Sequence, residues 1–229
     1  MSPNSENTIN SKIKMMSDTQ QNLDKTRMYR YVAIKRILDI VIAFCGLVIL
    51  LPFLLLIAIL IKCEDPKGSV IFSQIRVGKD GKLFRMYKFR SMVTNAEKLL
   101  DKLLDQNEVE GAMFKMKLDP RVTKVGRFIR KTSIDELPQL WNVIMGNMSL
   151  VGPRPPLPRE VEEYTEYQRL RLSVVPGCTG LWQVSGRSNL GFSEMVELDI
   201  QYIERRGLKT DLIILMKTIK VVLGSKDAF

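Results

Sequence analysis

The longest apolar run of the chain covers residues 40–61, where 22 consecutive residues carry no charged side chain. A straight helix of this length is about 33 Å long, and the hydrocarbon core of a bilayer is roughly 30 Å thick. The pattern therefore predicts a helix that resides in a membrane. We expect no signal peptide, because the run begins late and no small-residue cleavage site follows it.

The path of this helix in the membrane depends on its proline and its flanks. Pro52 lies near the middle, where a proline removes one backbone hydrogen bond and kinks a helix. Because positive flanks favour the cytoplasm, both ends are expected there. A helix that enters one leaflet, bends at Pro52 and returns satisfies both observations, whereas a single-span anchor with a tolerated proline is the alternative. The flanking cations are Arg27, Arg30, Lys35 and Arg36 before the run, and Lys62, Lys67, Arg76 and Lys79 after it.

The alternation of polar and apolar stretches divides the chain into three parts. Residues 1–34 are mostly polar and predict a mobile tail or a loose surface helix. Residues 35–62 contain the membrane helix, bent at Pro52, and residues 63–229 are assigned to one further domain that lies at the membrane. We expect an α+β fold that is mainly helical, with a helix-break-helix in the membrane and a small β-hairpin outside it.

The hairpin is predicted by two strand-like runs, residues 70–77 and 82–89, on either side of a loop that contains two glycines. A helix is predicted to begin at Thr94 or Asn95, because the apolar positions after it follow the helical period. Near the end, residues 212–223 predict an apolar helix suited to lying on a membrane or on the core.

Composition limits the chemistry that the chain can perform. The formal net charge of +10 suits nucleic acid, an anionic membrane surface or a phosphorylated substrate, and the long apolar run argues against nucleic acid. The chain has no histidine, which excludes Ser-His-Asp and Cys-His catalysis and histidine metal ligands. The cysteines lack the spacing of a metal site and are expected to be reduced packing residues: Cys45, Cys63 and Cys178.

Two adjacent acids, Asp135 and Glu136, lie in basic surroundings. Arg154 follows them within a Val-Gly-Pro-Arg-Pro-Pro segment. If the preceding segment is helical, it carries a cationic stripe that ends just before the acids, and a solvated or headgroup-facing surface is the alternative role of that stripe. The arrangement indicates an anionic, phosphorylated substrate. The cations of the stripe recur every three residues: Arg121, Lys124, Arg127 and Arg130.

A purely structural role for both acids is the main alternative. The segment 133–136 fits a capping box, with Ser133 as the N-cap and Glu136 three residues later. Pro138 fits better if Asp135 is the N-cap, because its missing N–H then costs nothing. In either arrangement the acids would only stabilise the start of a helix.

The functional interpretation gives the acids a chemical role. A helix N-terminus offers free N–H groups to a phosphate, and Arg130 and Arg154 can bring forked donors to the same point. A carboxylate there can attack phosphorus, because the surrounding cations neutralise the charge that otherwise repels it. Glu136 can hold Mg²⁺, which prefers one or two carboxylates together with substrate phosphate oxygens.

A set of short motifs occurs in one order along the chain. They are Lys35-Arg36 with Asp39, Tyr87-Lys88-Phe89-Arg90-Ser91-Met92, Asp119-Pro120-Arg121-Val122-Thr123, Asp135-Glu136-Leu137-Pro138-Gln139-Leu140, Met148-Ser149-Leu150-Val151-Gly152-Pro153-Arg154-Pro155, Pro176-Gly177-Cys178-Thr179-Gly180 and Gln183-Val184-Ser185-Gly186-Arg187. With these motifs, the chain from about Lys35 to about Gly224 resembles the bacterial sugar transferase family of monotopic polyprenyl-phosphate phosphoglycosyl transferases.

The resemblance implies a two-step reaction at the cytoplasmic face of the bacterial inner membrane, as the first membrane step of surface glycan assembly. Asp135 matches the nucleophile, which attacks the β-phosphate of a UDP-sugar, releases UMP and holds a covalent phosphosugar. Polyprenyl (undecaprenyl) phosphate then takes the phosphosugar and leaves as polyprenyl-diphosphate-sugar. Glu136 matches the second acid, associated with Mg²⁺, so that Glu136 and Asp135 are the expected metal residues.

The resemblance also assigns binding residues. Arg130 and Arg154 match positions that bind phosphate, and the looser candidates for substrate binding are Lys88, Gln183 and Arg187. Two positions depart from the family pattern. The family often has Ser before the helix-breaking proline, where this chain has Leu51, and an Asp before the Met-Ser pair, where it has Asn147, so we assign no metal ligand there.

The alternative from another functional class is a catalytically silent membrane-bound scaffold. In that case the basic face binds anionic lipid or a partner protein, and the two acids only cap a helix. The expected partners of the enzyme are a UDP-sugar donor, a polyprenyl phosphate acceptor and membrane lipids, with no nucleic acid. The sequence leaves open which sugar is transferred and whether the chain forms a homodimer.

Overall fold

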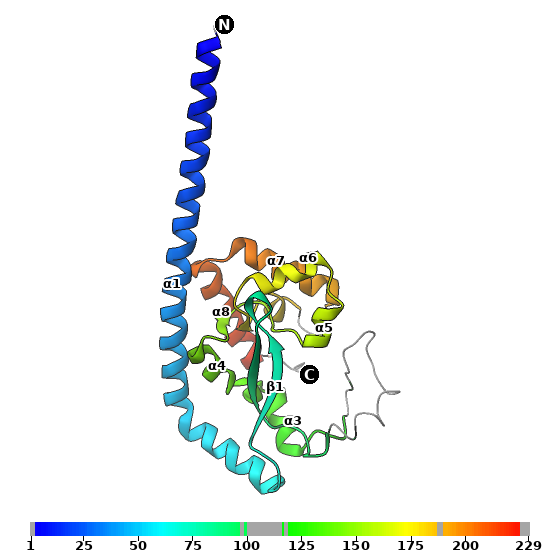
Figure 1. Ribbon diagram of the computed structural model, residues 1–229. Coiled ribbons are helices and arrows are strands. Elements are labelled where there is room, and N and C mark those ends of the chain that lie inside the picture. The colour runs from blue at the N-terminus through cyan, green and yellow to red at the C-terminus, as the bar shows by residue number, and fades with distance from the viewer. Residues whose placement is uncertain (1–2, 97–98, 100–115, 117–118, 187–189, 225–229) are drawn as a thin grey trace. The chain divides into compact units, whose positions relative to one another are not determined.

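The computed structural model describes residues 3–96, 99, 116, 119–186 and 190–224, and the chain forms two compact units, residues 1–38 and 39–229. Helix α1 (Pro3–Glu64) supplies the first unit and continues into the second (Figure 1). Of the two alternatives for the polar N-terminal segment, the structure therefore has the helix. The division at residues 34 and 62 stays a prediction.

Within α1, the segment Lys25–Glu64 is, in the described part of the chain, the one helix long and apolar enough to cross a membrane. The helix continues through Pro52, and Figure 1 shows it change direction near the middle of the apolar run. Large apolar side chains along this run remain exposed, among them Val48, Ile49, Leu55 and Ile59. Such an exposed apolar surface fits a lipid environment and agrees with the predicted membrane association.

Both ends of the apolar run are bonded to the rest of the second unit. At its start, the buried carboxylate of Asp39 accepts hydrogen bonds from Ser149 Oγ at 2.7 Å and from the Leu150 N–H at 3.2 Å. Ala43, one turn later, belongs to the main core cluster with Val143 and Met148. The start of the run is therefore fixed to elements more than a hundred residues away.

At the other end, Glu64 caps helix α3 (Lys124–Lys131). Its two carboxylate oxygens accept the Lys124 and Val125 N–H groups at 2.7 and 2.9 Å. Asp65 pairs with Arg90, so that two acids in sequence join the end of α1 to the domain. The same end buries apolar side chains in a second core cluster of Ile57, Ile61, Phe89 and Ile129.

The predicted hairpin is confirmed. Strands β1 (Ile71–Val77) and β2 (Leu83–Phe89) pair antiparallel, with Val77 opposite Leu83, and a short 3-10 turn, η1 (Lys79–Gly81), connects them. Asp80 (φ 56°) and Gly81 (φ 79°) both have positive φ, which the tight connection requires. Because side chains alternate along a strand, one face of the hairpin carries Arg76 and the residues opposite it.

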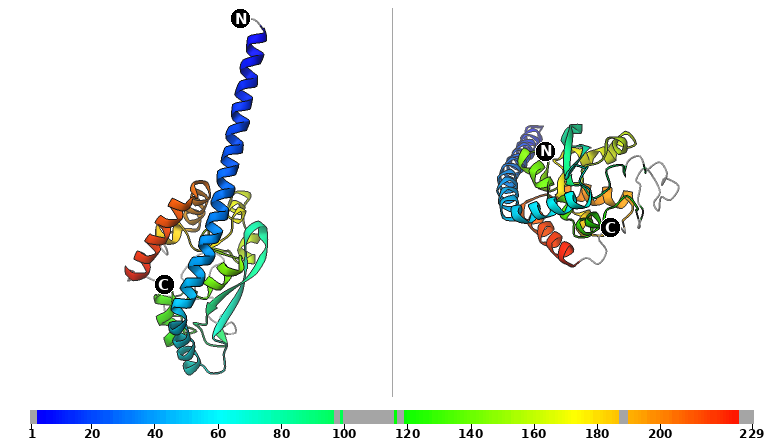
Figure 2. Two further views of the ribbon diagram at one scale, coloured as in Figure 1. Left: turned by 90° about the vertical axis from the view of Figure 1, so that its left-hand side faces the viewer. Right: turned by 90° about the horizontal axis from the view of Figure 1, so that it is seen from below.

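Helix α4 (Gln139–Met145) contacts β2 and β3 (Ser149–Val151), and β3 pairs parallel with β4 (Gly177–Thr179). Helix α8 (Leu208–Gly224) contacts β3 and β4, and Figure 2 shows it on the side of the unit opposite the hairpin. The predicted apolar C-terminal helix is thereby confirmed. The remaining elements are η3 (Ile134–Glu136), α5 (Pro158–Glu162), α6 (Glu166–Arg169), η4 (Leu170–Ser173), η5 (Trp182–Val184) and α7 (Phe192–Arg205).

Two predictions about elements need comment. The cationic stripe was expected to include Arg121, but α3 begins only at Lys124, and Arg121 is buried and paired with Asp119 at 2.7 Å. That expectation is wrong because Arg121 lies in a turn that precedes the N-cap Thr123. The helix predicted after Thr94 falls largely outside the described residues.

Candidate functional site

The two acids lie in η3, a single 3-10 turn that joins α3 to α4. Ser133 has a left-handed conformation with φ 56° and makes no capping bond through its side chain. Helix α4 begins only at Gln139, with Pro138 as its N-cap. The capping box predicted for Ser133 is therefore wrong, and so is an N-cap at Asp135. The local reason is the 3-10 turn, in which the N–H groups of Glu136 and Leu137 bond to backbone carbonyls.

Glu136 is held by a cation from the hairpin. Lys88 Nζ lies 2.7 Å from Glu136 Oε1, and both side chains are half-buried. Burial raises the pKa of Glu136, but Lys88, with further help from Arg154 and Arg76, outweighs burial and holds that pKa below its usual range. Glu136 is therefore a carboxylate at neutral pH, and Lys88 is its ion-pair partner.

Asp135 is in a different environment. It is 7% exposed, and its carboxylate makes no hydrogen bond or ion pair with another side chain of the described residues. Burial raises the pKa of Asp135 to about 6, with Glu136 acting in the same direction and Lys88 and Arg130 opposing. A backbone hydrogen bond also opposes the shift, but a carboxylate buried without a side-chain partner is still costly to ionise. Acids with such a raised pKa are common at functional sites.

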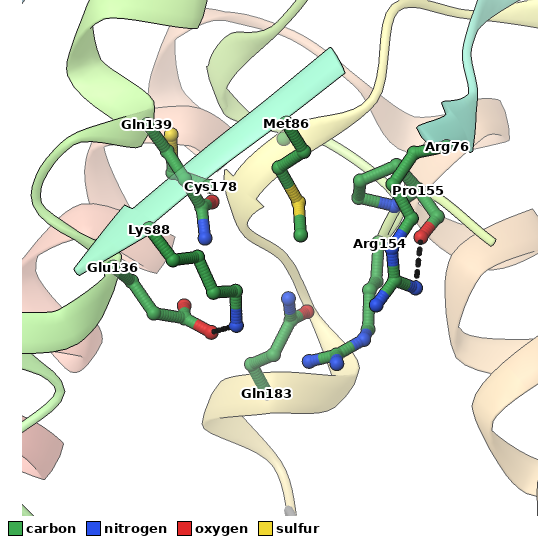
Figure 3. A pocket seen from close by; sticks show the side chains of 10 residues that line it. Arg76, Met86, Lys88, Glu136, Gln139, Arg154, Pro155, Cys178 and Gln183 are labelled. Carbon is green, nitrogen blue, oxygen red and sulfur yellow. Dashed lines mark hydrogen bonds and ion pairs between the residues drawn. The ribbon is translucent and has the colours of Figure 1, made fainter. Parts of the chain in front are cut away.

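A pocket opens beside Glu136 (Figure 3), and Asp135 is not among its lining residues. Glu136 and Lys88 form one side of it, Arg154 with Arg76 forms the other, and Met86 lies between them. The walls come from both hairpin strands, η3, α4, β4, η5 and the loop after β3, so the pocket gathers segments that are far apart in the sequence. Its lining residues are Arg76, Met86, Lys88, Glu136, Gln139, Arg154, Pro155, Gly177, Cys178 and Gln183.

The loop that carries Arg154 is held on two sides. On one side the Gly177 N–H donates to Pro153 O at 2.9 Å, and on the other the Val77 N–H donates to Pro156 O at 2.9 Å. A Cβ on Gly177 would lie 2.1 Å from the backbone nitrogen of Gly152, so this close approach requires glycine. The loop therefore presents Arg154 to the pocket from a fixed backbone.

The predicted binding residues divide into three groups. Lys88, Arg154 and Gln183 line the pocket, and their role in substrate binding stays a prediction. Arg130 is exposed at the end of α3 and does not line the pocket, although its charge acts on Asp135. Arg187 lies outside the described residues, so its role stays a prediction.

Two of the polar side chains that line the pocket, Arg76 and Gln139, were not named among the site residues predicted from the sequence. Arg76 was counted only as a flanking charge, although its inward position in an alternating strand was a usable signal. Gln139 is 3% exposed, and its amide makes no hydrogen bond within the described residues while it lines the pocket. Its place one helical turn after Asp135 was the signal that could have found it. Burial raises the pKa of the Cys178 thiol, in agreement with a packing role.

The residues present fit a weakly coordinated divalent metal. Among the described residues no cluster of three or more His, Cys, Asp or Glu side chains could form an all-protein cage. Mg²⁺ is commonly held by one or two carboxylates, with substrate phosphate oxygens and water as the other ligands. Asp135 and Glu136 could supply that pair of carboxylates.

Comparisons with known proteins show which family the chain is similar to. The family model described as Bacterial sugar transferase matches residues 30–225. The chain is 50% identical over 196 residues to the galactosyl transferase CpsE of Streptococcus agalactiae, covering 85% of this chain and 43% of that protein. It is 46% identical over 219 residues to the undecaprenyl-phosphate galactose phosphotransferase of Salmonella typhimurium, covering 94% and 45%.

A shorter relative is matched over most of its length. The exopolysaccharide production protein ExoY of Sinorhizobium fredii is 40% identical over 199 residues, covering 85% of this chain and 88% of that protein. The chain thus spans less than half the length of the first two relatives and most of the third.

Proposed function

The chain belongs to the bacterial sugar transferase family, and from that premise we propose that it transfers a sugar 1-phosphate from a UDP-sugar to polyprenyl phosphate and releases UMP. The observation that carries the proposal is the buried carboxylate of Asp135, which has no side-chain partner among the described residues. Asp135 does not itself line the cationic pocket, but it directly precedes Glu136, which does. The names of two relatives specify galactose, so UDP-galactose is the first donor to test.

In the first step, a carboxylate oxygen of Asp135 attacks the β-phosphorus of the donor. The bond from that phosphorus to the bridging oxygen breaks, UMP leaves with that oxygen, and the sugar phosphate remains on Asp135 as an acyl phosphate. Lys88 and Arg154 offset the negative charge of the phosphoryl group during the attack. Burial makes the carboxylate of Asp135 a better nucleophile, because it is poorly stabilised as a free anion.

In the second step, a phosphate oxygen of polyprenyl phosphate attacks the same phosphorus. The bond from phosphorus to the Asp135 oxygen breaks, which restores the carboxylate and yields polyprenyl-diphosphate-sugar. Glu136 is placed to accept a proton if the acceptor attacks from its monoanionic form. Its lowered pKa keeps it unprotonated at neutral pH, and it also lowers the affinity of Glu136 for that proton.

We assign Mg²⁺ as the cofactor, which Glu136 and Asp135 would hold. When bound, the ion would neutralise charge on the phosphates and orient them. Glu136 would then interact with both the metal and Lys88. Both side chains are only half-buried, so Lys88 could move away from Glu136.

The proposed membrane arrangement is monotopic, with the helix re-entrant around Pro52 and the domain on the cytoplasmic face. Its support is the bonding of both ends of the apolar run to the same unit, through Asp39 to Ser149 and through Glu64 to the start of α3. A helix that crossed the bilayer would separate its ends by the thickness of the hydrocarbon core. Only one of these two sets of bonds could then form.

This arrangement predicts that residues on both flanks react from the same side of the membrane. We compare two single-cysteine variants, the C45S/C178A protein with native Cys63 and the I34C/C45S/C63S/C178A protein, whose reporter positions are exposed in the structure. In intact spheroplasts, a membrane-impermeant maleimide is expected to label neither protein. After the membrane is disrupted, both should be labelled. Labelling of only one of the two in intact spheroplasts would establish a single-span anchor.

The reaction is tested by UMP release from the full chain in nanodiscs with Mg²⁺, undecaprenyl phosphate and a panel of UDP-sugars. Release with one donor, lost when the metal is chelated, is expected. No release with any donor, from folded and membrane-bound protein, would favour a catalytically silent scaffold that binds anionic lipid or a partner protein.

A further inference from the structure

Arg76 is an almost fully buried cation that has no carboxylate partner among the described residues. It lies in β1 and is 7% exposed. Its Nη1 donates to Pro155 O at 3.0 Å and its Nη2 donates to Gln74 Oε1 at 2.7 Å. Its Nε is buried and makes no hydrogen bond with the described residues. The guanidinium is thus held only by neutral acceptors, an expensive arrangement for a buried charge.

A second guanidinium, that of Arg154, lies beside it on the same wall of the pocket (Figure 3). Burial, and after it the charge of Arg154, lower the pKa of Arg76 to about 10, so Arg76 remains a cation at neutral pH. Glu136 is the one carboxylate among the lining residues, and it is already paired with Lys88 across the pocket. The lining therefore has three cations and one carboxylate.

We propose that Arg76 and Arg154 form a paired guanidinium site that binds a phosphate-type dianion. A dianion there would neutralise the excess charge of the lining. It would also give Arg76 a direct counter-ion, because Glu160 and Glu136 act on its charge without forming an ion pair with it in the described residues. Guanidinium groups suit this task, because their fork can bond two phosphate oxygens at once. The identification of the dianion as the diphosphate of the donor rests on the proposed function.

The proposal also explains why Arg76 bonds to the loop that carries Arg154. With the neighbouring Val77 N–H, which bonds to Pro156, it fixes the loop at two consecutive carbonyls. Like charges repel, so the two guanidinium groups need this tie to stay together before an anion arrives. Arg76 is thus both a binding residue and a positioning residue for Arg154.

The test measures binding of inorganic pyrophosphate to the full chain in nanodiscs by calorimetry, without donor or acceptor. R76Q is expected to weaken binding at least about tenfold, because it removes a charge-assisted contact to phosphate. R76K, which keeps the charge but loses the fork, should lie between R76Q and the unmodified protein. The matched control is R85Q on the neighbouring strand, where Arg85 is exposed and does not line the pocket, and it should bind normally.

Unchanged affinity in R76Q and R76K would overturn the inference, as would no measurable binding to the unmodified protein. If R76Q does not fold, the pyrophosphate affinity of R76K tests the inference instead. Its melting temperature shows whether that variant is folded. The two proposals fail separately. Pyrophosphate binding that depends on Arg76, in a protein that transfers no sugar phosphate, refutes only the proposed function. Transfer that is intact in R76Q refutes only the inference.

Discussion

Asp135→Asn is expected to abolish sugar-phosphate transfer and, at the same time, to stabilise the fold. The amide is nearly isosteric with the carboxylate but cannot act as the nucleophile, so we expect the rate to fall by about a thousandfold or more. The stabilisation has a separate origin. Asp135 is buried without a side-chain partner among the described residues, and its ionisation at neutral pH costs free energy that the neutral amide does not.

The sign of the stability effect follows from the pKa. Burial raises the pKa of Asp135 from 3.8 to about 6, so the folded state binds this proton more tightly than the unfolded state. The penalty is full above pH 6 and disappears as the pH falls toward 4. A shift of about two pKa units corresponds to about 3 kcal/mol. D135N should therefore unfold at a higher temperature than the unmodified protein at pH 7.5, and the difference should close at acid pH.

Glu136 supplies a matched control, because replacing it by its amide should change the folding stability in the opposite direction. The pKa of Glu136 is held below its usual range, mainly by Lys88 acting against burial, so its ionised form stabilises the fold at neutral pH. E136Q should consequently lower the unfolding temperature at pH 7.5. Full activity in D135N would contradict a nucleophilic role for Asp135. An inactive but destabilised D135N would instead indicate that Asp135 acts through the structure.

Arg171→Gln is expected to cause the largest loss of stability. Arg171 and Asp199 form a buried pair, with Nε and Nη2 of Arg171 at 2.8 and 2.7 Å from Asp199 Oδ2, and Asp199 is 0% exposed. Arg171 also donates to the Tyr164 hydroxyl at 2.8 Å and lies over the Tyr164 and Phe192 rings. Removing one member of a buried pair leaves the other charge uncompensated, which costs about 3–5 kcal/mol.

The double variant R171Q/D199N separates charge from packing. Burial already raises the pKa of Asp199 to about 6 against the effect of Arg171, so in R171Q that pKa should rise further. The loss of folding stability in R171Q should then become smaller as the pH falls and Asp199 becomes protonated. The double variant should be more stable than R171Q at pH 7.5, and its stability should lack this pH dependence. Equal unfolding temperatures of both variants at every pH would assign the loss to packing around the two rings.

The parts of the molecule that could be predicted from the sequence are those set by local pattern. The apolar run, the hairpin and the C-terminal apolar helix depend on periodicity and on turn residues, and the structure contains all three. The start of α4 was placed wrongly, because the pattern Ser133 to Glu136 satisfies the chemistry of a cap while the chain forms a 3-10 turn there. A local motif cannot choose between these two hydrogen-bond patterns.

The candidate site was predicted in part, for a related reason. Charges in unusual sequence surroundings could be recognised directly, and these are Asp135, Glu136 and Arg154. Lys88 was predicted only from the family motifs. Arg76 was missed because its role comes from a bond to Pro155, 79 residues away in the sequence. Such contacts are created by the fold, and nothing in a single sequence marks which buried arginine will lack a carboxylate.

The most direct test of the central claim is incubation of the purified chain with its UDP-sugar in the absence of polyprenyl phosphate. The account predicts a burst of UMP no larger than the amount of enzyme, and a gain in intact mass equal to one sugar phosphate, mapped to Asp135 and absent in D135N. Addition of polyprenyl phosphate should then remove the extra mass. UMP release that requires the acceptor from the start, with no adduct at any time, would contradict a covalent role for Asp135.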